Sequence, residues 1–169
     1  MEHPVTEVNL ATKHDTLVLE RTYQASPERV FAAWSEPAIH KVWDAPGGGW
    51  ELAKLEMDFR IGGREYSRFG PPGDPRYWSE GVYLDILPGR RIVSAGTMHD
   101  GELRIAVTLG TIELFPEEGG TRLRLTDQSA FLEGREDASD RKSGYGAALD
   151  KLEAFLAGDQ PGRFKEGSL

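Results

Sequence analysis

The sequence predicts an α+β domain in which a curved antiparallel sheet wraps around one long C-terminal helix. Two observations predict this class. From residue 53 to residue 125, short runs of alternating apolar and polar residues are separated by tight-turn signals, as in consecutive antiparallel hairpins. After residue 145 the apolar period becomes that of a helix, and only this helix is long enough to cover the apolar face of such a sheet.

The first elements precede the meander. Residues 16–23 alternate as a strand, and Ser26-Pro27-Glu28 then starts a helix. Serine is a good N-cap, proline suits the first helical position, and glutamate is favourable at the positive helix N-terminus. A second short helix follows Pro37 and runs over residues 38–43. We therefore expect one strand followed by two short helices.

Six further strands are expected, which makes seven in the sheet. They cover residues 53–59, 65–69, 78–86, 92–99 and 103–109, with a last strand beginning near residue 123. The turns between them contain Gly62-Gly63, residues 70–75, Pro88-Gly89, Asp100-Gly101 and residues 117–120. Pro-Gly matches the centre of a type II turn, and Asp-Gly is a strong hairpin signal.

The C-terminal helix is predicted by Tyr145, Ala148, Leu149, Leu152, Phe155 and Leu156, which share one helical face. Asp137 or Ser139 could cap its start, and Gly158 ends it. Gly144 and Gly146 each cost about 1 kcal/mol inside a helix. We expect them to allow close approach to the sheet or to leave room for a ligand. On the alternative interpretation the helix begins only after Gly146. Close approach predicts that at least one Gly→Ala change is destabilising or weakens binding.

Composition bounds the function. The 169 residues fit one domain, over residues 14–158, with an N-terminal arm at 1–13 and a flexible tail at 159–169. A net charge of −8 argues against nucleic acid, and the absence of Cys excludes disulfides and thiolate chemistry. No apolar run approaches the ~20 residues of a membrane span, and no signal peptide is recognisable. We expect a cytoplasmic protein without a cofactor, either monomer or homodimer.

Five motifs carry a family resemblance. They are residues 23–34, Pro37 with Val42-Trp43, residues 58–63 (Asp-Phe-Arg-Ile-Gly-Gly), residues 81–86 (Gly-Val-Tyr-Leu-Asp-Ile), and Gly144-Tyr145. Together they resemble the START-related helix-grip (SRPBCC) superfamily, in the group named for the activator of the heat-shock protein 90 ATPase. The resemblance runs from residue 16 to residue 158. It implies a START-like, helix-grip fold with a cavity between sheet and helix. Functions across the group include lipid or hormone binding, polyketide cyclisation and chaperone co-regulation.

Candidate cavity residues are mainly aromatic, because Tyr and Trp combine an apolar body with a hydrogen-bonding tip. The candidates are Trp43, Trp50, Met57, Tyr66, Arg68, Trp78, Phe131, Tyr145 and Leu149. The alternative is that the aromatic residues belong to the core. Arg68 could hold an anionic ligand or extend into solvent. The charges around the Gly62-Gly63 turn are interpreted as hairpin ion pairs.

The leading hypothesis is binding of a small apolar or amphipathic molecule. The rival is a cyclase- or dehydratase-like enzyme that uses Tyr66, Tyr145 or His40 as acid or base. A third is a module that binds a chaperone or regulator. No metal site is expected, because the four histidines are scattered without a second ligand nearby. Nucleophile-elbow, P-loop and dinucleotide motifs are absent, which leaves enzymatic activity open but less favoured than binding.

Overall fold

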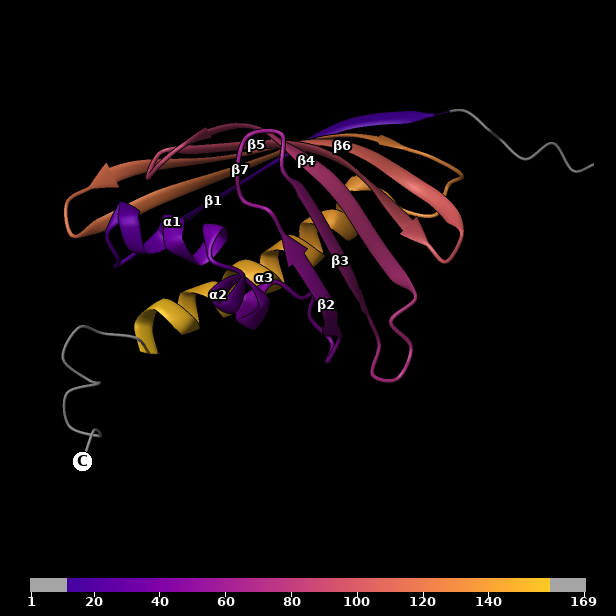
Figure 1. Ribbon diagram of the computed structural model, residues 1–169, viewed down its shortest axis with the longest axis horizontal. Coiled ribbons are helices and arrows are strands. Elements are labelled where there is room, and N and C mark those ends of the chain that lie inside the picture. The colour runs from indigo at the N-terminus through magenta and orange to yellow at the C-terminus, as the bar shows by residue number, and fades with distance from the viewer. Residues whose placement is uncertain (1–11, 159–169) are drawn as a thin grey trace, which may run out of the picture.

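Seven antiparallel strands curve around one long helix in the computed structural model, which describes residues 12–158 (Figure 1). The elements are β1 (Lys13–Tyr23), α1 (Pro27–Ser35), α2 (Pro37–Trp43), β2 (Glu51–Met57), β3 (Arg64–Gly70), β4 (Tyr77–Leu87), β5 (Arg91–Asp100), β6 (Leu103–Glu117), β7 (Gly120–Phe131) and α3 (Ala138–Gly158). The predicted fold class is confirmed. Residues 1–11 of the expected arm and the expected tail at 159–169 lie outside the described residues.

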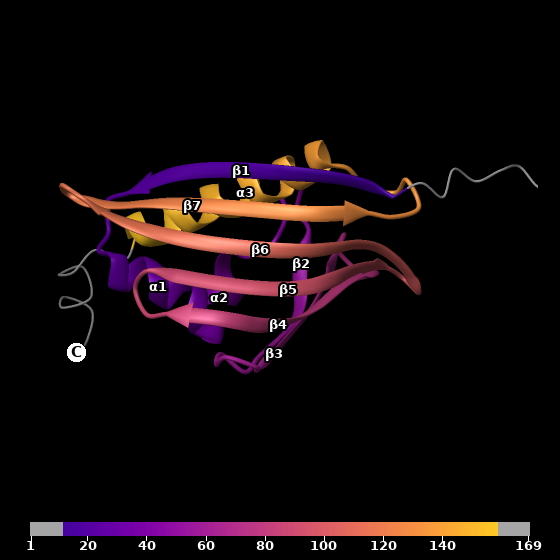
Figure 2. The same cartoon turned by 90° about the horizontal axis from the view of Figure 1, so that it is seen from above.

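The sheet is a meander from β2 to β7 that closes on β1. Its order is β1-β7-β6-β5-β4-β3-β2, and every pairing is antiparallel. Figure 2 shows β1, β7, β6, β5 and β4 side by side, with α3 crossing one face. β1 begins three residues before the expected start at Thr16, because Lys13 already pairs with Phe131 at the end of β7.

The two short helices form where the sequence predicts them. The Ser26 hydroxyl accepts a hydrogen bond from the Arg29 amide at 3.3 Å, and Pro27 occupies the first turn of α1. Val30 and Ala33 are fully buried, so α1 packs one face inward. α1 and α2 lie on the same side of the sheet as α3 (Figure 1).

A reciprocal cap starts α3. The Asp140 amide donates to the Asp137 carboxylate at 3.0 Å, and the Asp137 amide donates back to Asp140 at 3.1 Å. This capping box places the helix start at Ala138. The interpretation that the helix begins after Gly146 is therefore wrong.

The prediction that Gly144 and Gly146 allow a close approach of the helix to the sheet is also wrong. A Cβ atom built on Gly144 would lie 4.0 Å from the Pro46 Cβ, and one on Gly146 would lie 3.7 Å from the Arg21 Nη2, which are ordinary contacts. The tight contact lies in the loop between α2 and β2, where a Cβ on Gly47 would stand 3.0 Å from that of Ala147.

One part of the space between sheet and α3 is densely packed. Leu149, Leu152 and Leu156 of α3 belong to one buried cluster with side chains of β1, β6, β7, α1 and α2. The Tyr23 hydroxyl donates to the Leu149 carbonyl at 3.1 Å, which ties β1 to the middle of the helix. We call this region, over the C-terminal half of α3, the filled half.

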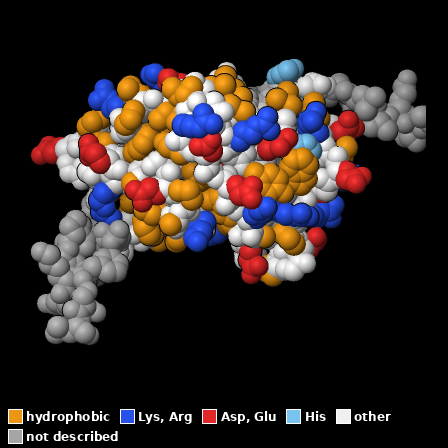
Figure 3. All heavy atoms as spheres, viewed as in Figure 1, with side chains coloured by type: hydrophobic (Ala, Val, Ile, Leu, Met, Phe, Trp, Pro, Cys, Tyr) orange, Lys and Arg blue, Asp and Glu red, His pale blue; other side chains and the backbone are white. Residues whose placement is uncertain are grey.

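The described residues contain no helix long and apolar enough to cross a membrane. On the face seen in Figure 3, Lys and Arg side chains alternate with Asp and Glu, and no extended basic patch is visible there.

Candidate functional site

A cleft of about 750 Å³ lies between the N-terminal half of α3 and the concave face of β3 to β6. Gly144, Tyr145 and Ala148 of α3 line one side of it. The loop between α2 and β2 forms an edge of the cleft. Lys151 of α3 donates to the carbonyls of Ala45 and Pro46 at 3.0 and 3.2 Å, which holds this loop against the helix. We call this space the cleft.

Aromatic side chains form one wall of the cleft. Trp50 stacks on Tyr77 with ring centroids 5.0 Å apart, and Phe69 stacks on Tyr77 at 6.0 Å. All three line the cleft. Such flat, amphipathic surfaces suit the apolar body of a small ligand.

The floor of the cleft is polar and made of small residues. Ser67 and Ser79 face each other across β3 and β4, and their hydroxyls are 2.7 Å apart. Ser94, Gly96 and Gly110 continue this floor over β5 and β6. A hydroxyl has one proton and two lone pairs, so each serine retains capacity to bind a ligand after this contact.

A buried ion-pair network closes one end of the cleft. Arg141 donates to Asp127 at 2.8 Å and to Glu136 at 2.7 Å, and the side chains of Arg141 and Asp127 are only 8% and 2% exposed. The Tyr145 hydroxyl also donates to Asp127 at 2.8 Å. Burial lowers the pKa of Arg141, but Tyr145, Glu136 and Asp127 raise it more, so the guanidinium stays charged. Arg141 is thus fully engaged by protein groups.

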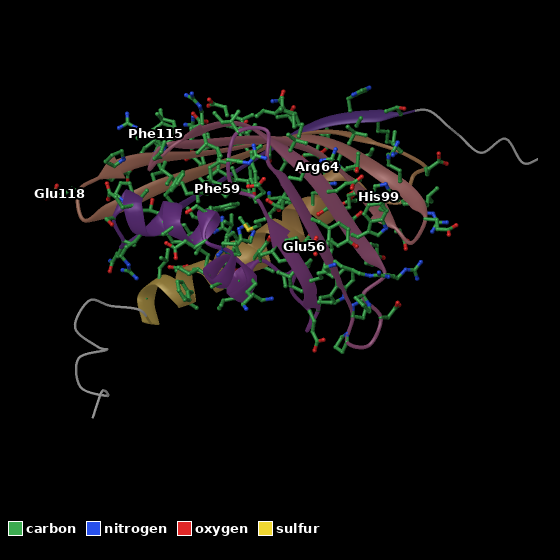
Figure 4. The ribbon with its side chains drawn as sticks, in the orientation of Figure 1. Glu56, Phe59, Arg64, His99, Phe115 and Glu118 are labelled. Carbon is green, nitrogen blue, oxygen red and sulfur yellow. The ribbon has the colours of Figure 1, made fainter. Side chains whose placement is uncertain are left out.

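A second cavity of about 170 Å³ adjoins the cleft, and we call it the inner chamber. Glu65, Ser94, Gly110 and Tyr145 line both spaces. Phe59, labelled in Figure 4, closes part of the inner chamber and packs edge-on against Tyr83 with centroids 4.9 Å apart. The four shared residues make the inner chamber a continuation of the cleft.

His40 is held as an imidazolium beside the inner chamber. Its Nε2 lies 2.6 Å from the Asp44 carboxylate, and its Nδ1 lies 2.9 Å from the Trp34 carbonyl. Both partners are acceptors, so both ring nitrogens must carry protons. Burial lowers the pKa of His40, but Asp44 above all, together with Glu65 and the Trp34 carbonyl, raises it on balance to about 9.

Glu65 is a buried carboxyl group at the junction of the two spaces. Burial raises its pKa, while His40 and a short hydrogen bond from the Tyr83 hydroxyl oppose that rise without cancelling it. The pKa of Tyr83 is raised by burial and by Glu65, so Tyr83 remains the donor. Glu65 can therefore accept, or in its protonated form donate, a hydrogen bond to a molecule in the cleft.

The structure brings together only part of the predicted set. Trp50 and Tyr145 line the cleft. Trp43, Phe131 and Leu149 do not line it and are buried at 1 to 4% exposure; the Trp43 indole donates to the Ala33 carbonyl at 3.0 Å. Met57 packs at the edge of the core cluster. These placements correspond to the core alternative stated for the aromatic residues.

Tyr66, Arg68 and Trp78 lie on the convex face of the sheet. Glu65, Ser67 and Phe69 line the cleft, and successive residues of a strand point to opposite faces. Trp78 instead stacks on His99 with centroids 3.6 Å apart, near the end of the sheet where Figure 4 labels that histidine. Arg68 donates to the Pro75 carbonyl at 2.7 Å. Alternation shows which residues share a face but does not show which face is concave.

Sequence reasoning missed Glu65, Asp127 and Arg141. The available signal was the small residues at alternate strand positions, namely Ser67, Ser79, Gly81, Ser94, Gly96 and Gly110, where a packed core would carry Val or Leu. No group of three or more His, Asp or Glu side chains in residues 12–158 is arranged to hold a metal ion.

Several solved bacterial structures are similar to this chain. An uncharacterized protein from Rhizobium leguminosarum is 38% identical over 88% of this chain and 98% of its own, with a TM-score of 0.81. Protein Mll3558 from Rhizobium loti is 39% identical over 85% of this chain and 98% of its own, with a TM-score of 0.77. The AHSA1-like protein from Aeromonas hydrophila is 19% identical, covers 85% of this chain and 93% of its own, and shares the fold with a TM-score of 0.66.

A comparison with curated proteins finds no match. The family model described as activator of Hsp90 ATPase homolog 1-like protein matches residues 24–157, from the end of β1 to the last turn of α3. That range contains every element from α1 to α3 except the last residue of α3, and it confirms the resemblance carried by the five sequence motifs. The chain belongs to the activator of Hsp90 ATPase homolog 1-like family.

Proposed function

We propose that the cleft binds a small molecule with an apolar body and at least one hydrogen-bonding group. One observation carries this proposal: along the same helix and sheet, dense leucine packing gives way to about 750 Å³ lined by aromatic, small and polar residues. Ligand pockets commonly measure roughly 300–1,000 Å³ and combine apolar walls with a few convergent polar groups.

The charge of the lining favours a neutral or cationic ligand over an anion. Four carboxyl groups line the cleft, those of Asp44, Glu65, Glu136 and Asp140, against the two guanidinium groups of Arg135 and Arg141. Arg141 is already paired with Asp127 and Glu136. The anionic ligand considered for Arg68 has no support from this lining, since Arg68 lies on the convex face.

The enzyme alternative now depends on Glu65. Tyr66 does not line the cleft, burial raises the pKa of Tyr145, and His40 already uses both ring nitrogens. Among residues 12–158, Glu65 alone combines a raised pKa, a tyrosine donor and contact with the cleft. Acid–base chemistry would therefore show a pH–rate profile that Glu65→Gln abolishes.

Titration with N-phenyl-1-naphthylamine, a neutral apolar fluorophore, tests the binding proposal. We expect saturable binding of about one molecule per chain, with quenching of tryptophan emission because Trp50 lines the cleft. Gly144→Leu should weaken binding by roughly tenfold or more, because its side chain enters the cleft beside Pro46.

Gly146→Leu is the matched control. It changes the same helix by the same side chain, but Gly146 faces Arg21 and does not line the cleft. The affinity of this variant for N-phenyl-1-naphthylamine should stay within twofold of that of the wild type. Equal loss in both variants, or unsaturable binding of many probe molecules, would contradict a ligand site in the cleft.

A further inference from the structure

We propose that the polar end of the ligand is a protonated amine that binds in the cleft against the Glu65 carboxylate. This inference rests on the proposed binding function and specifies the chemical class of the ligand, an amine with an apolar body. It follows from three features of the site: a carboxyl group without an ion-pair partner, hydroxyl groups beside it, and neighbouring donors that are already used.

Glu65 has a free oxygen and no cation in contact with it. Its Oε2 accepts from the Tyr83 hydroxyl, and within residues 12–158 its other oxygen takes part in no hydrogen bond. No Lys, Arg or His side chain of that range forms an ion pair with it. Charged groups that are largely removed from water are usually paired. This partly buried carboxyl group therefore lacks a counter-ion that a ligand can supply.

His40 does not fill that role. Its Nε2 lies 2.6 Å from the Asp44 carboxylate, and it acts on Glu65 only at longer range. One imidazolium thus faces two carboxyl groups, which leaves a negative charge unbalanced when Glu65 is ionised. His40 lines the inner chamber but not the cleft, whereas Glu65 lines both. An ammonium group in the cleft can therefore reach Glu65 without contacting the imidazolium.

The hydroxyl groups near Glu65 can accept from the same ammonium group. Ser67 lies two residues further along β3, on the same face of the sheet, and it lines the cleft. Ser94 lines both the cleft and the inner chamber, as Glu65 does. Each serine oxygen has two lone pairs, so it accepts from a ligand even when its own proton is used elsewhere.

Strong donors of the two spaces are already used by the protein. Tyr83 donates to Glu65, while Tyr145 and Arg141 each donate to Asp127 at 2.8 Å. A ligand carboxylate would find these donors occupied and would be repelled by Glu65. An ammonium group donates hydrogen bonds and accepts none, so it fits the acceptors that remain. Burial raises the pKa of Glu65, and an adjacent ammonium group would lower that pKa again.

Three probes with one naphthalene body test the proposal by displacement of N-phenyl-1-naphthylamine near neutral pH. They are 2-(2-naphthyl)ethylamine, which is protonated there, 2-naphthaleneethanol and 2-naphthylacetate. Without a counter-ion in the cleft, the amine would bind more weakly than the alcohol, because a charged group loses more hydration. We expect the amine instead to bind about fivefold more tightly than the alcohol, and at least about tenfold more tightly than the carboxylate.

Glu65→Gln removes the charge and keeps the size of the side chain. The affinity for the amine should fall about tenfold relative to that for the alcohol, because the charge-assisted hydrogen bond is lost. The carboxylate should gain affinity relative to the alcohol, because the repulsion is removed. A cooperative urea transition shows that the variant is folded. The comparison of the three probes on the wild type decides without it.

Glu80→Gln is the matched control. It makes the same change of charge on the neighbouring strand, but Glu80 pairs with Tyr66 on the convex face of the sheet. The ratio of the affinities for the amine and the alcohol should stay within about twofold of the wild-type ratio, because an exposed charge on the other face is screened by solvent and salt.

The outcomes separate the two proposals. If N-phenyl-1-naphthylamine itself does not bind, the proposed function fails, and the inference fails with it. If it binds, but the amine is no tighter than the alcohol, only the amine assignment is overturned. The same holds if Glu65→Gln weakens the amine and the alcohol equally, or if Glu80→Gln lowers the affinity for the amine as much as Glu65→Gln does.

Discussion

The two halves of α3 cover the same sheet in different ways. Along β7 the inward residues run from Leu123 and Leu125 to Asp127 and Ser129, and along β6 they run from Leu114 and Ile112 to Gly110 and Thr108. The change from large apolar residues to small or polar ones occurs at the same position on both strands, because Leu125 pairs with Ile112 and Asp127 pairs with Gly110.

This shared level separates the part of the molecule that supplies most of the core packing from the part that we propose binds a ligand. On one side of it the leucines of α3 are packed against β1, β6, β7 and α1. On the other side the sheet offers small and polar residues to the cleft. Substitutions should therefore separate the two properties, and the following predictions test that separation in order of expected effect.

Arg141→Met should have the largest effect, a loss of about 3–5 kcal/mol in the free energy of unfolding. It leaves Asp127 and Glu136 buried without their partner. Urea denaturation measures the loss. Arg135→Met, at a side chain 57% exposed, is the control and should change stability little. A loss below about 1 kcal/mol for Arg141→Met would show that the network does not hold the end of the cleft together.

Leu152→Ala should cost about 3–4 kcal/mol, because a fully buried side chain of the filled half is lost. It should leave the affinity for N-phenyl-1-naphthylamine unchanged. Leu52→Ala, in the lining of the cleft, should do the reverse: it costs about 1 kcal/mol and weakens binding. If Leu152→Ala weakens binding as much as Leu52→Ala, the two halves are not separate.

Stability should fall by about 3 kcal/mol as the pH rises from about 6.5 to about 9. His40 has a folded-state pKa raised to about 9, so its contribution is complete below its unfolded value of 6.5 and disappears as the folded imidazolium loses its proton. The pKa of Glu65 is raised by burial, which acts in the same direction at lower pH. Urea midpoints across this range give the slope, and His40→Gln should flatten it. A stability that rises with pH in the wild type would contradict the imidazolium.

Gly144→Ala and Gly146→Ala should each stabilise the protein by about 0.4–1 kcal/mol. Both positions are helical, and an added Cβ meets only ordinary contacts. The sequence-based expectation was that at least one change would destabilise the fold or weaken probe binding, and its first part is now reversed. Chemical denaturation measures both changes, and a loss of stability at either position would contradict this prediction.

Local chemistry made most of the fold predictable. Ser26-Pro27 marks the start of α1, and Asp137 caps α3. Asp100-Gly101 marks the hairpin between β5 and β6, although Asp100 still pairs with Leu103 and the turn begins at Gly101. These signals act over a few residues, so one sequence is enough to identify them.

The cleft was harder to predict because its lining depends on which sheet face is concave. Tyr66 and Glu65 are neighbours on β3 but point to opposite sides. Asp127 and Arg141, 14 residues apart, meet only through the fold. A charged residue on a helix otherwise suggests a solvent-exposed face.

The four tryptophans allow a direct test of the central claim, that ligands bind in the cleft. Trp50 lines the cleft, Trp34 lines the inner chamber, Trp43 lies in the core, and Trp78 stacks on His99 on the convex face. Their indole N–H signals can be followed in one ¹H–¹⁵N spectrum during titration with N-phenyl-1-naphthylamine. We predict the largest shift at Trp50, a smaller one at Trp34, and none at Trp43 or Trp78. A shift at Trp78 with Trp50 and Trp34 unchanged would place binding on the convex face and contradict the account.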